Sequence, residues 1–265
     1  MAAAVTAAVS MAAAAAAADS TAAGTMEAAA MPAATSAATA AAMPAATATT
    51  MPMPAATATA AITVVAMAGV PRSAAELVVA PIAIEFARQH PEVTIEVIVG
   101  DALTDIVASG FDAGVRFGES LQQDMIAVRI GPAQRGVIVG SPAYFEGRRV
   151  PVTPSDLQDH VCIRRRFAGG GIYRWELEKD GEAVVVAVDG GLILNDDRLI
   201  ADAALTGAGL AYVFEGQVKT KIAAGDLITV LDDWCPSFPG FFLYYPSRRL
   251  MRPTLRALVD FARAS

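Results

Sequence analysis

The chain has 265 residues, with 20 basic and 27 acidic side chains and a formal net charge of −7. This acidic balance argues against a protein built around nucleic acid, and two cysteines are too few for a disulfide scaffold. From residue 62 onward the sequence contains no run of the roughly 18 apolar residues that a membrane-spanning helix needs, so we expect no such helix there.

Residues 1–61 differ in composition from the rest of the chain. They contain 32 alanines, seven of the ten methionines and no Lys or Arg. Because the segment has few large side chains to bury, the entropy lost on ordering is not offset, and we expect a disordered tail. It shows neither the basic start nor the leucine-rich core of a secretory signal. Without cations it offers nothing to hold the phosphates of DNA.

The folded part begins with a strand and a helix. Residues 62–68 form an apolar, β-branched run that predicts a buried strand. Ser73 and Glu76 have the spacing of a capping box, which predicts a helix from just after Ser73 to the residues before Pro91, bent at Pro81. Apolar residues at helical spacing predict its buried face, namely Leu77, Ala80, Ile84 and Ala87.

The next elements continue the alternation. Residues 93–99 alternate apolar and polar side chains, as a strand does. Asp101 is placed to cap a short helix that contains Leu103 and ends at Gly110, and residues 112–117 predict a third strand. Strands that alternate with helices at this pitch indicate a parallel α/β sheet.

The second half predicts shorter elements. Asp180-Gly181 is a strong hairpin signal, and helices should start at Ser141-Pro142, at Thr153-Pro154 and after Asn195-Asp196. The expected strands are 126–130, 136–140, 173–178, 183–188, 210–214, 227–231 and 241–245, with a final helix after Pro253. We interpret the whole as an α/β protein of two lobes with a cleft between them.

Three loops combine a strand end with a helix start: Arg72-Ser73, Asp101-Ala102 and Asn195-Asp196. Free N–H groups at a helix N-terminus favour an anion, and the carboxyl ends of strands line the ligand crevice of open α/β sheets. These loops are therefore candidates to face one cleft. Plain helix capping is the alternative explanation for each of them.

The remaining polar groups are considered as anion-binding, phosphate-binding, metal-binding or catalytic residues. In a strand, alternate members of Arg164–Arg166 point to opposite faces; a solvated face is the preferred interpretation and an anion-binding arginine the alternative. Phe167 opens a glycine-rich loop without the Lys and Ser/Thr of a phosphate-binding loop. His160 and Cys162 have no second ligand pair at zinc spacing, and no catalytic motif occurs. We therefore expect no metal, no cofactor and no enzymatic activity.

From about Ile62 to the C-terminus the sequence resembles the effector-binding domain of LysR-type transcriptional regulators. The stretches that carry the resemblance, in order, are VPRSAAELVVAPIAIEFARQHPEVTIEV (70–97), GFDAGVRFGESLQQDMIAVRIG (110–131), SPAYF (141–145), TPSDLQDHVCI (153–163), YRWELEKDGE (173–182), ALTGAGLAYV (204–213) and FPGFFLYYPSRR (238–249). The resemblance implies two Rossmann-like lobes, as in type 2 periplasmic binding proteins. Lobe I would comprise about 62–131 and 240–265, and lobe II about 132–239.

The resemblance also implies a small effector in the cleft between the lobes, and dimerisation. Carried over by position, the effector-binding residues would be Arg72, Ser73, Asp101, Ala102, Phe167, Asn195 and Asp196. The helix N-termini suggest an anionic effector, such as a carboxylate. We expect a cytoplasmic, non-enzymatic sensor that makes no membrane contact.

Members of this family carry a winged helix-turn-helix before the effector domain, whereas residues 1–61 lack its amphipathic and basic pattern. We therefore expect the chain to bind DNA only if a helix-turn-helix is supplied. The composition change near residue 61 suggests a truncated or frame-shifted gene, which translation of the upstream DNA in all frames would test. The alternative function is that of an exported solute-binding protein with the same two-lobe fold.

Overall fold

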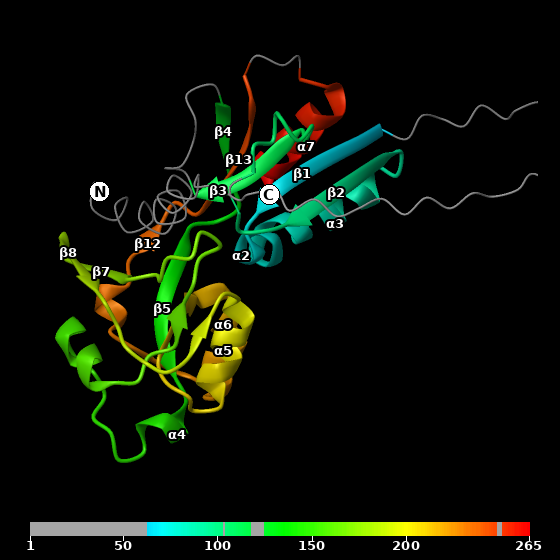
Figure 1. The fold of residues 1–265 in the computed structure, drawn as a ribbon. Coiled ribbons are helices and arrows are strands. Elements are labelled where there is room, and N and C mark those ends of the chain that lie inside the picture. Colours follow the sequence, from blue (N-terminus) through cyan, green and yellow to red (C-terminus); the bar gives the residue numbers. More distant parts are fainter. Residues whose placement is uncertain (1–62, 103, 118–124, 248–250) are drawn as a thin grey trace, which may run out of the picture.

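The computed structural model describes residues 63–102, 104–117, 125–247 and 251–265. The predicted disordered tail, residues 1–61, and Leu103 lie outside these ranges. Figure 1 shows two lobes, one above the other, each built around its own sheet. The expected two-lobe α/β fold is confirmed, while the residue boundaries of the lobes stay a prediction. No helix within the described part of the chain combines the length and hydropathy that crossing a membrane requires.

Lobe I contains a five-stranded sheet in the order β2-β1-β3-β13-β4. β1 runs parallel to β2 and to β3, whereas β13 is antiparallel to both of its neighbours. The strands are β1 (Thr63–Val70), β2 (Val93–Val99), β3 (Ala113–Phe117), β4 (Met125–Ile130) and β13 (Phe241–Pro246). The first three strands therefore give the parallel pairing that the sequence predicts, and the last strand returns from lobe II to complete the sheet.

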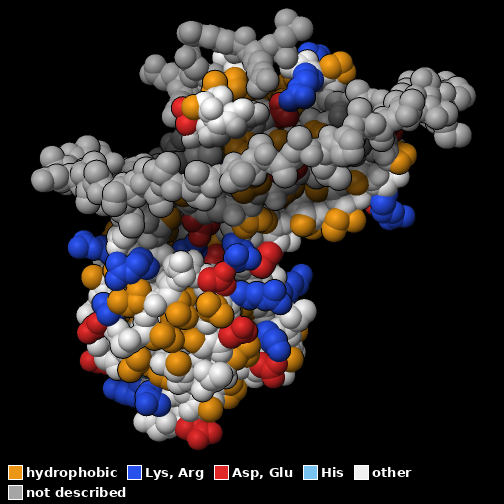
Figure 2. Space-filling model, turned by 45° about the vertical axis from the view of Figure 1, so that its right-hand side comes forward, with side chains coloured by type: hydrophobic (Ala, Val, Ile, Leu, Met, Phe, Trp, Pro, Cys, Tyr) orange, Lys and Arg blue, Asp and Glu red, His pale blue; other side chains and the backbone are white. Residues whose placement is uncertain are grey.

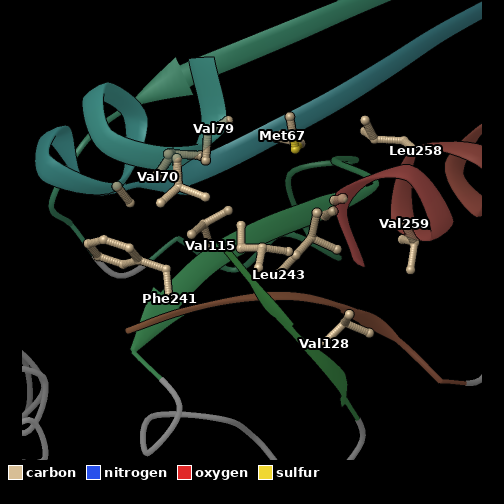
Figure 3. Close-up of a cluster of buried hydrophobic side chains, with 14 of the residues drawn as sticks. Met67, Val70, Val79, Val115, Val128, Phe241, Leu243, Leu258 and Val259 are labelled. Carbon is tan, nitrogen blue, oxygen red and sulfur yellow. The ribbon is translucent and has the colours of Figure 1, made fainter. Parts of the chain in front are cut away.

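The core of lobe I lies between this sheet and two helices, α3 (Ala80–Gln89) and α7 (Pro253–Ala264), which contact each other. Figure 3 shows part of it, with Val79 and Leu258 from the helical layer gathered against Met67, Val115 and Leu243 of the sheet. These five side chains are all buried. The core fixes the carboxyl ends of β1 and β2 and thus the loops that follow them.

The first helix differs from its prediction at the start. It begins at Arg72 in α2 (Arg72–Ala74), with Pro71 as the N-cap and no side-chain cap. The predicted start after Ser73 through a capping box is therefore wrong, and Ser73 lies buried inside the first turn. The end before His90-Pro91 is confirmed.

The buried face of this helix also differs from its prediction. A π-helical segment, η1 (Ala75–Val79), follows α2 and changes the phase of the side chains along the helix. Val78, Val79 and Phe86 are buried, whereas Ile84 is exposed. Of the predicted face, Leu77 is half-buried and packs against the core, whereas Ala80 and Ala87 are exposed like Ile84, so most of the face predicted with a constant helical period is wrong.

The segment after β2 is not the helix that Asp101 was expected to cap. Its described residues form bends and a turn over 106–110. The turn is stabilised by Asp105, whose side chain accepts hydrogen bonds from the backbone N–H groups of Val107 (2.9 Å) and Ala108 (3.0 Å). Gly110 adopts the positive φ that ends it. Asp101 is thereby left free to bind elsewhere.

Lobe II is built around β5, to which the other strands of its main sheet pair. Smaller two-stranded sheets, β6-β9 and β7-β8, pack beside it, and the second is the predicted hairpin with positive φ at Asp180 and Gly181. The strands are β5 (Gln134–Gly140), β6 (Arg164–Arg165), β7 (Trp175–Lys179), β8 (Glu182–Val186), β9 (Ile193–Leu194), β10 (Ala211–Phe214), β11 (Ile228–Val230) and β12 (Ser237–Phe238).

The helices of lobe II are α4 (Pro142–Phe145), η2 (Pro154–Asp159), α5 (Asp197–Leu205), α6 (Glu215–Ala224) and η3 (Asp232–Trp234). The predicted starts at Ser141-Pro142, Thr153-Pro154 and Asn195-Asp196 are confirmed. Helix α6 was not predicted, because Val218 is its one buried residue and its apolar period is weak.

Two segments connect the lobes, and they lie side by side. The chain passes from β4 to β5 through residues 131–133 and returns from β12 to β13 through residues 239–240. β12 pairs antiparallel with β5, with Phe238 opposite Gln134. Ring contacts among Phe117, Phe214, Phe238 and Phe241 fill the space at this crossing. The crossing is therefore a packed hinge.

Candidate functional site

Among the residues that the structure describes, two ion pairs cross from one lobe to the other. Arg72 Nε of lobe I lies 2.7 Å from Asp196 of lobe II, and Arg165 Nη2 of lobe II lies 3.3 Å from Asp101 of lobe I. Arg72 follows β1, Asp101 follows β2 and Asp196 precedes α5. The structure thus brings together the three loops that the sequence selected. At the level where the lobes meet, Figure 2 shows basic and acidic side chains mixed on the surface.

Arg165 lies at the centre of this arrangement. It is 8% exposed and forms ion pairs with Asp101 and with Asp197, a residue of its own lobe that is 3% exposed. Burial lowers the pKa of Arg165, and the negative charge of Asp101 is the largest of the influences that oppose this. Sequence reasoning preferred a solvated face for Arg164–Arg166; for Arg165 that is wrong. The alternation itself is confirmed, since Arg166 is exposed.

A small pocket adjoins Arg165. Its enclosed volume is about 10 Å³, room for about one water molecule, and the 310 Å³ between its lining atoms includes the open solvent at its mouth. Mainly apolar and aromatic residues of lobe II and the hinge line it: Gly136, Arg165, Tyr173, Asp197, Tyr212, Val213, Phe214 and Phe238. At Gly136 a Cβ would lie 2.3 Å from the Tyr212 hydroxyl, so the absence of a side chain there lets the ring approach the backbone.

The polar end of this pocket has hydrogen-bonding capacity that the described protein leaves unused. Arg165 Nε and Asp197 Oδ2 are both buried and have no hydrogen-bond partner among the described residues. Burial also raises the pKa values of Tyr173 and Tyr212, so these hydroxyls are neutral donors at physiological pH. The pocket therefore offers an apolar wall with a charged group at one end.

The Asp101-Ala102 loop is held from beneath by Arg116. This arginine is 8% exposed, and its Nη2 donates a hydrogen bond to the Ala102 carbonyl oxygen over 2.9 Å. Gly69 has a positive φ, and a Cβ there would lie 3.0 Å from the same nitrogen. The buried arginine thereby positions the backbone next to Asp101.

The remaining predicted site residues occupy different environments. Asp196 caps α5, because its side chain accepts from the N–H groups of Arg198 and Leu199, so the capping explanation holds at this loop together with the ion pair to Arg72. Asn195 is exposed, and Phe167 is buried in the core of lobe II against Tyr173, 5.8 Å beneath the Arg165 guanidinium. Phe167 therefore supports Arg165 rather than opening into the cleft.

Helix α6 adds a contact between the lobes that the sequence did not suggest. Gln217 Nε2 donates to Glu76 over 3.1 Å. A Cβ at Gly216 would lie 2.8 Å from the Leu77 side chain, so the start of α6 packs closely on the first helix of lobe I. The ion pairs between the lobes are thus accompanied by direct packing of α6 on the first helix of lobe I.

The described residues contain no group of three or more His, Cys, Asp and Glu side chains arranged to hold a metal ion. His160 Nδ1 instead lies 3.1 Å from the Tyr144 hydroxyl. Cys162 is fully buried, and burial raises its pKa to about 12. His160 and Cys162 therefore make packing and hydrogen-bond contacts that stabilise lobe II.

Comparison with known proteins identifies relatives of this chain. A putative transcriptional regulator of Pseudomonas aeruginosa is 45% identical over 173 residues, covering 65% of this chain and 56% of the relative. The HTH-type transcriptional regulator PgrR of Escherichia coli is 45% identical over 188 residues, covering 71% of this chain and 63% of the relative. The chain thus spans about three-fifths of the length of these curated relatives.

Among solved structures, the regulatory domain of AphB from Vibrio vulnificus matches with a TM-score of 0.62 and 24% identity, covering 78% of this chain and all of that one. The regulatory domain of CrgA from Neisseria meningitidis matches with a TM-score of 0.63 and 20% identity, covering 76% of this chain and 97% of that one. These similarities concern the fold.

The exported solute-binding alternative finds no support among these relatives, which are transcriptional regulators. The family described as the LysR substrate binding domain matches residues 68–265, most of the chain. This match and the two-lobe fold agree with one another, and the chain belongs to the LysR substrate-binding domain family.

Proposed function

We propose that this chain senses a small effector in the cleft between its lobes and transmits binding to a transcription regulator. The observation that carries the proposal is the meeting of Arg72, Asp101, Asp196 and Arg165 from both lobes beside a pocket. A ligand that contacts both lobes stabilises one relative orientation over others, which is a shift between populated states.

The proposed binding residues are those expected from the sequence, with Arg165 added. Arg72 and Arg165 supply charge, and Ser73 lies in the first helical turn, where backbone N–H groups face outward. Asp101, Ala102, Asn195 and Asp196 complete the rim, and Phe167 supports Arg165 from below. The proposed ligand is a small anion, for which a carboxylate is the simplest example.

The proposal extends to the organisation of the protein. We propose lobe boundaries at about 62–131 with 240–265, and 132–239, since the two connecting segments fall at these positions. We also propose that the domain is cytoplasmic, non-enzymatic and self-associating. DNA contact would come from a helix-turn-helix segment joined to it.

Isothermal calorimetry on the purified chain, with a panel of small carboxylates and their amides, tests the site. Arg72→Ala should weaken carboxylate binding about tenfold or more, as loss of a charge-assisted hydrogen bond does, and Ser73→Ala by a few-fold. Arg88→Ala is the matched control, because Arg88 lies on the same helical segment but pairs with Glu85 on its exposed side. Unchanged affinity in both cleft variants would contradict the site assignment.

A further inference from the structure

The Arg165 guanidinium forms ion pairs with carboxylates from two different lobes. Asp197 approaches Nη1 from the same lobe, and Asp101 approaches Nη2 from the other lobe at 3.3 Å. An arginine at the end of an apolar pocket is a natural partner for the carboxylate of a ligand. In this structure that position is occupied by side chains of the protein itself.

We propose that Asp101 is an internal stand-in for the effector's carboxylate, which takes its place on Arg165 when the effector binds. This deepens the proposed function, because it rests on effector binding in the cleft and names the group that decides which ligands are accepted. The ligand class is a carboxylate attached to a small apolar or aromatic body.

The difference in burial decides which of the two aspartates leaves Arg165 when a ligand binds. The side chain of Asp197 is 3% exposed and follows the N-cap of α5, so it cannot reach water without opening lobe II. The side chain of Asp101 is 29% exposed and stands on a loop between β2 and the turn at 106–110. When Asp101 leaves Arg165, water solvates it at small cost, whereas the same step for Asp197 would strand a buried charge.

The local charge favours an exchange over a simple addition. Arg72 and Arg165 face three carboxylates, those of Asp101, Asp196 and Asp197. An additional carboxylate among them would raise the excess of negative charge in a half-buried cleft, where like charges repel strongly. If Asp101 swings out as the ligand enters, Arg165 keeps two negative partners. Asp101 therefore competes with carboxylates and has no such effect on uncharged ligands.

The pocket indicates the body of the ligand. Tyr173, Tyr212, Phe214 and Phe238 contribute aromatic surface next to Arg165, so an apolar or aromatic group of a ligand held by Arg165 would pack against this surface at the mouth of the pocket. The exchange also has a consequence for the lobes. Because the contact between Asp101 and Arg165 joins lobe I to lobe II, its replacement by a ligand removes an ion pair between the lobes and leaves the one between Arg72 and Asp196.

Calorimetry with phenylacetate and its uncharged analogue phenylacetamide tests the exchange on the full chain. Asp101→Asn should bind phenylacetate about three- to fivefold more tightly than the unaltered protein, the gain expected from removing a partly exposed competing ion pair. Phenylacetamide should show a change of less than about twofold. Asp189→Asn is the matched control: it removes the same charge from the partner of the neighbouring Arg164, outside the pocket.

Arg165→Gln should abolish phenylacetate binding. Because this change leaves Asp197 buried without its cation, the combined variant Arg165→Gln with Asp197→Asn serves if the single variant does not fold. Amide hydrogen exchange supplies a second measurement. Exchange in residues 104–110 should rise when phenylacetate binds the unaltered protein, and should already be raised in Asp101→Asn.

The outcomes separate the exchange from the proposed function. If Asp101→Asn binds phenylacetate no more tightly than the unaltered protein, or if neither binds it, Asp101 is not a stand-in for a carboxylate. If phenylacetamide or another uncharged compound then still binds and is sensitive to Arg72→Ala, cleft sensing stands without the exchange. If no compound of the panel binds, both fail.

Discussion

Asp101 and Asp197 bind the same guanidinium in different surroundings, and removing each should cost a different free energy of unfolding. The Arg165–Asp197 pair is almost fully enclosed, with side chains 10% and 3% exposed. Asp197→Ala leaves a buried cation without its nearer partner, which costs about 3–5 kcal/mol. Asp101→Ala removes a partner that is 29% exposed and 3.3 Å away, which costs about 0.2–1 kcal/mol.

Urea unfolding followed by circular dichroism at pH 7 measures both costs. With an m-value of about 2 kcal/mol/M, Asp197→Ala should lower the midpoint by roughly 1.5–2.5 M, and Asp101→Ala by less than about 0.5 M. The combined variant Arg165→Met with Asp197→Leu should recover most of the loss, because an apolar pair needs no desolvation of charge. Equal midpoints for the two single variants would refute the argument that burial, rather than the ion pair itself, sets the cost.

Two further predictions concern the hinge and the buried thiols. Gly131→Ala should destabilise the protein by about 2–4 kcal/mol in urea melts, since Gly131 has a positive φ and a Cβ there would lie 2.8 Å from Val78. Gly147→Ala, with positive φ but open space around it, should cost only about 1–2 kcal/mol, and equal costs would contradict the close packing at the hinge. Burial raises the pKa of Cys162 and Cys235 to about 12. Because unfolded thiols lose protons from about pH 8.5 upward, the stability that these neutral thiols contribute is complete below that pH and falls as pH rises toward 12, by up to about 1.4 kcal/mol per pH unit for each thiol. Replacing both with Ala should flatten this slope in urea melts between about pH 9 and 11, and an unchanged slope would show that the thiols do not titrate as described.

Much of the fold was predictable because its signals are local. The alternation in residues 93–99, the hairpin turn at Asp180-Gly181 and the proline-marked helix starts each depend on a few neighbouring residues. The start and the buried face of the first helix were predicted wrongly although their signals are also local. The capping spacing of Ser73 and Glu76 yielded to a helix that starts at Arg72 and contains a π-turn.

The candidate site was predictable in part. Arg72, Asp101 and Asp196 were selected as loop residues at strand ends, and the structure brings them together where the two lobes meet. Arg165 was judged a solvated residue because three consecutive arginines resemble a surface segment. Arg165 contacts Asp101, which is 64 positions away in the chain, and no local sequence pattern indicates a contact at that separation.

By itself, the sequence determined the α/β class, the order of most elements, the family resemblance and the loops that carry polar groups, because periodicity, turn chemistry and motif order are written along the chain. Tertiary structure alone decided which charges meet. β6 pairs with β9 and thereby turns Arg165 inward beside Asp197, and the hinge sets Asp101 against it from the other lobe. The energy of an ion pair depends on distance and burial, and both are properties of the packed lobes.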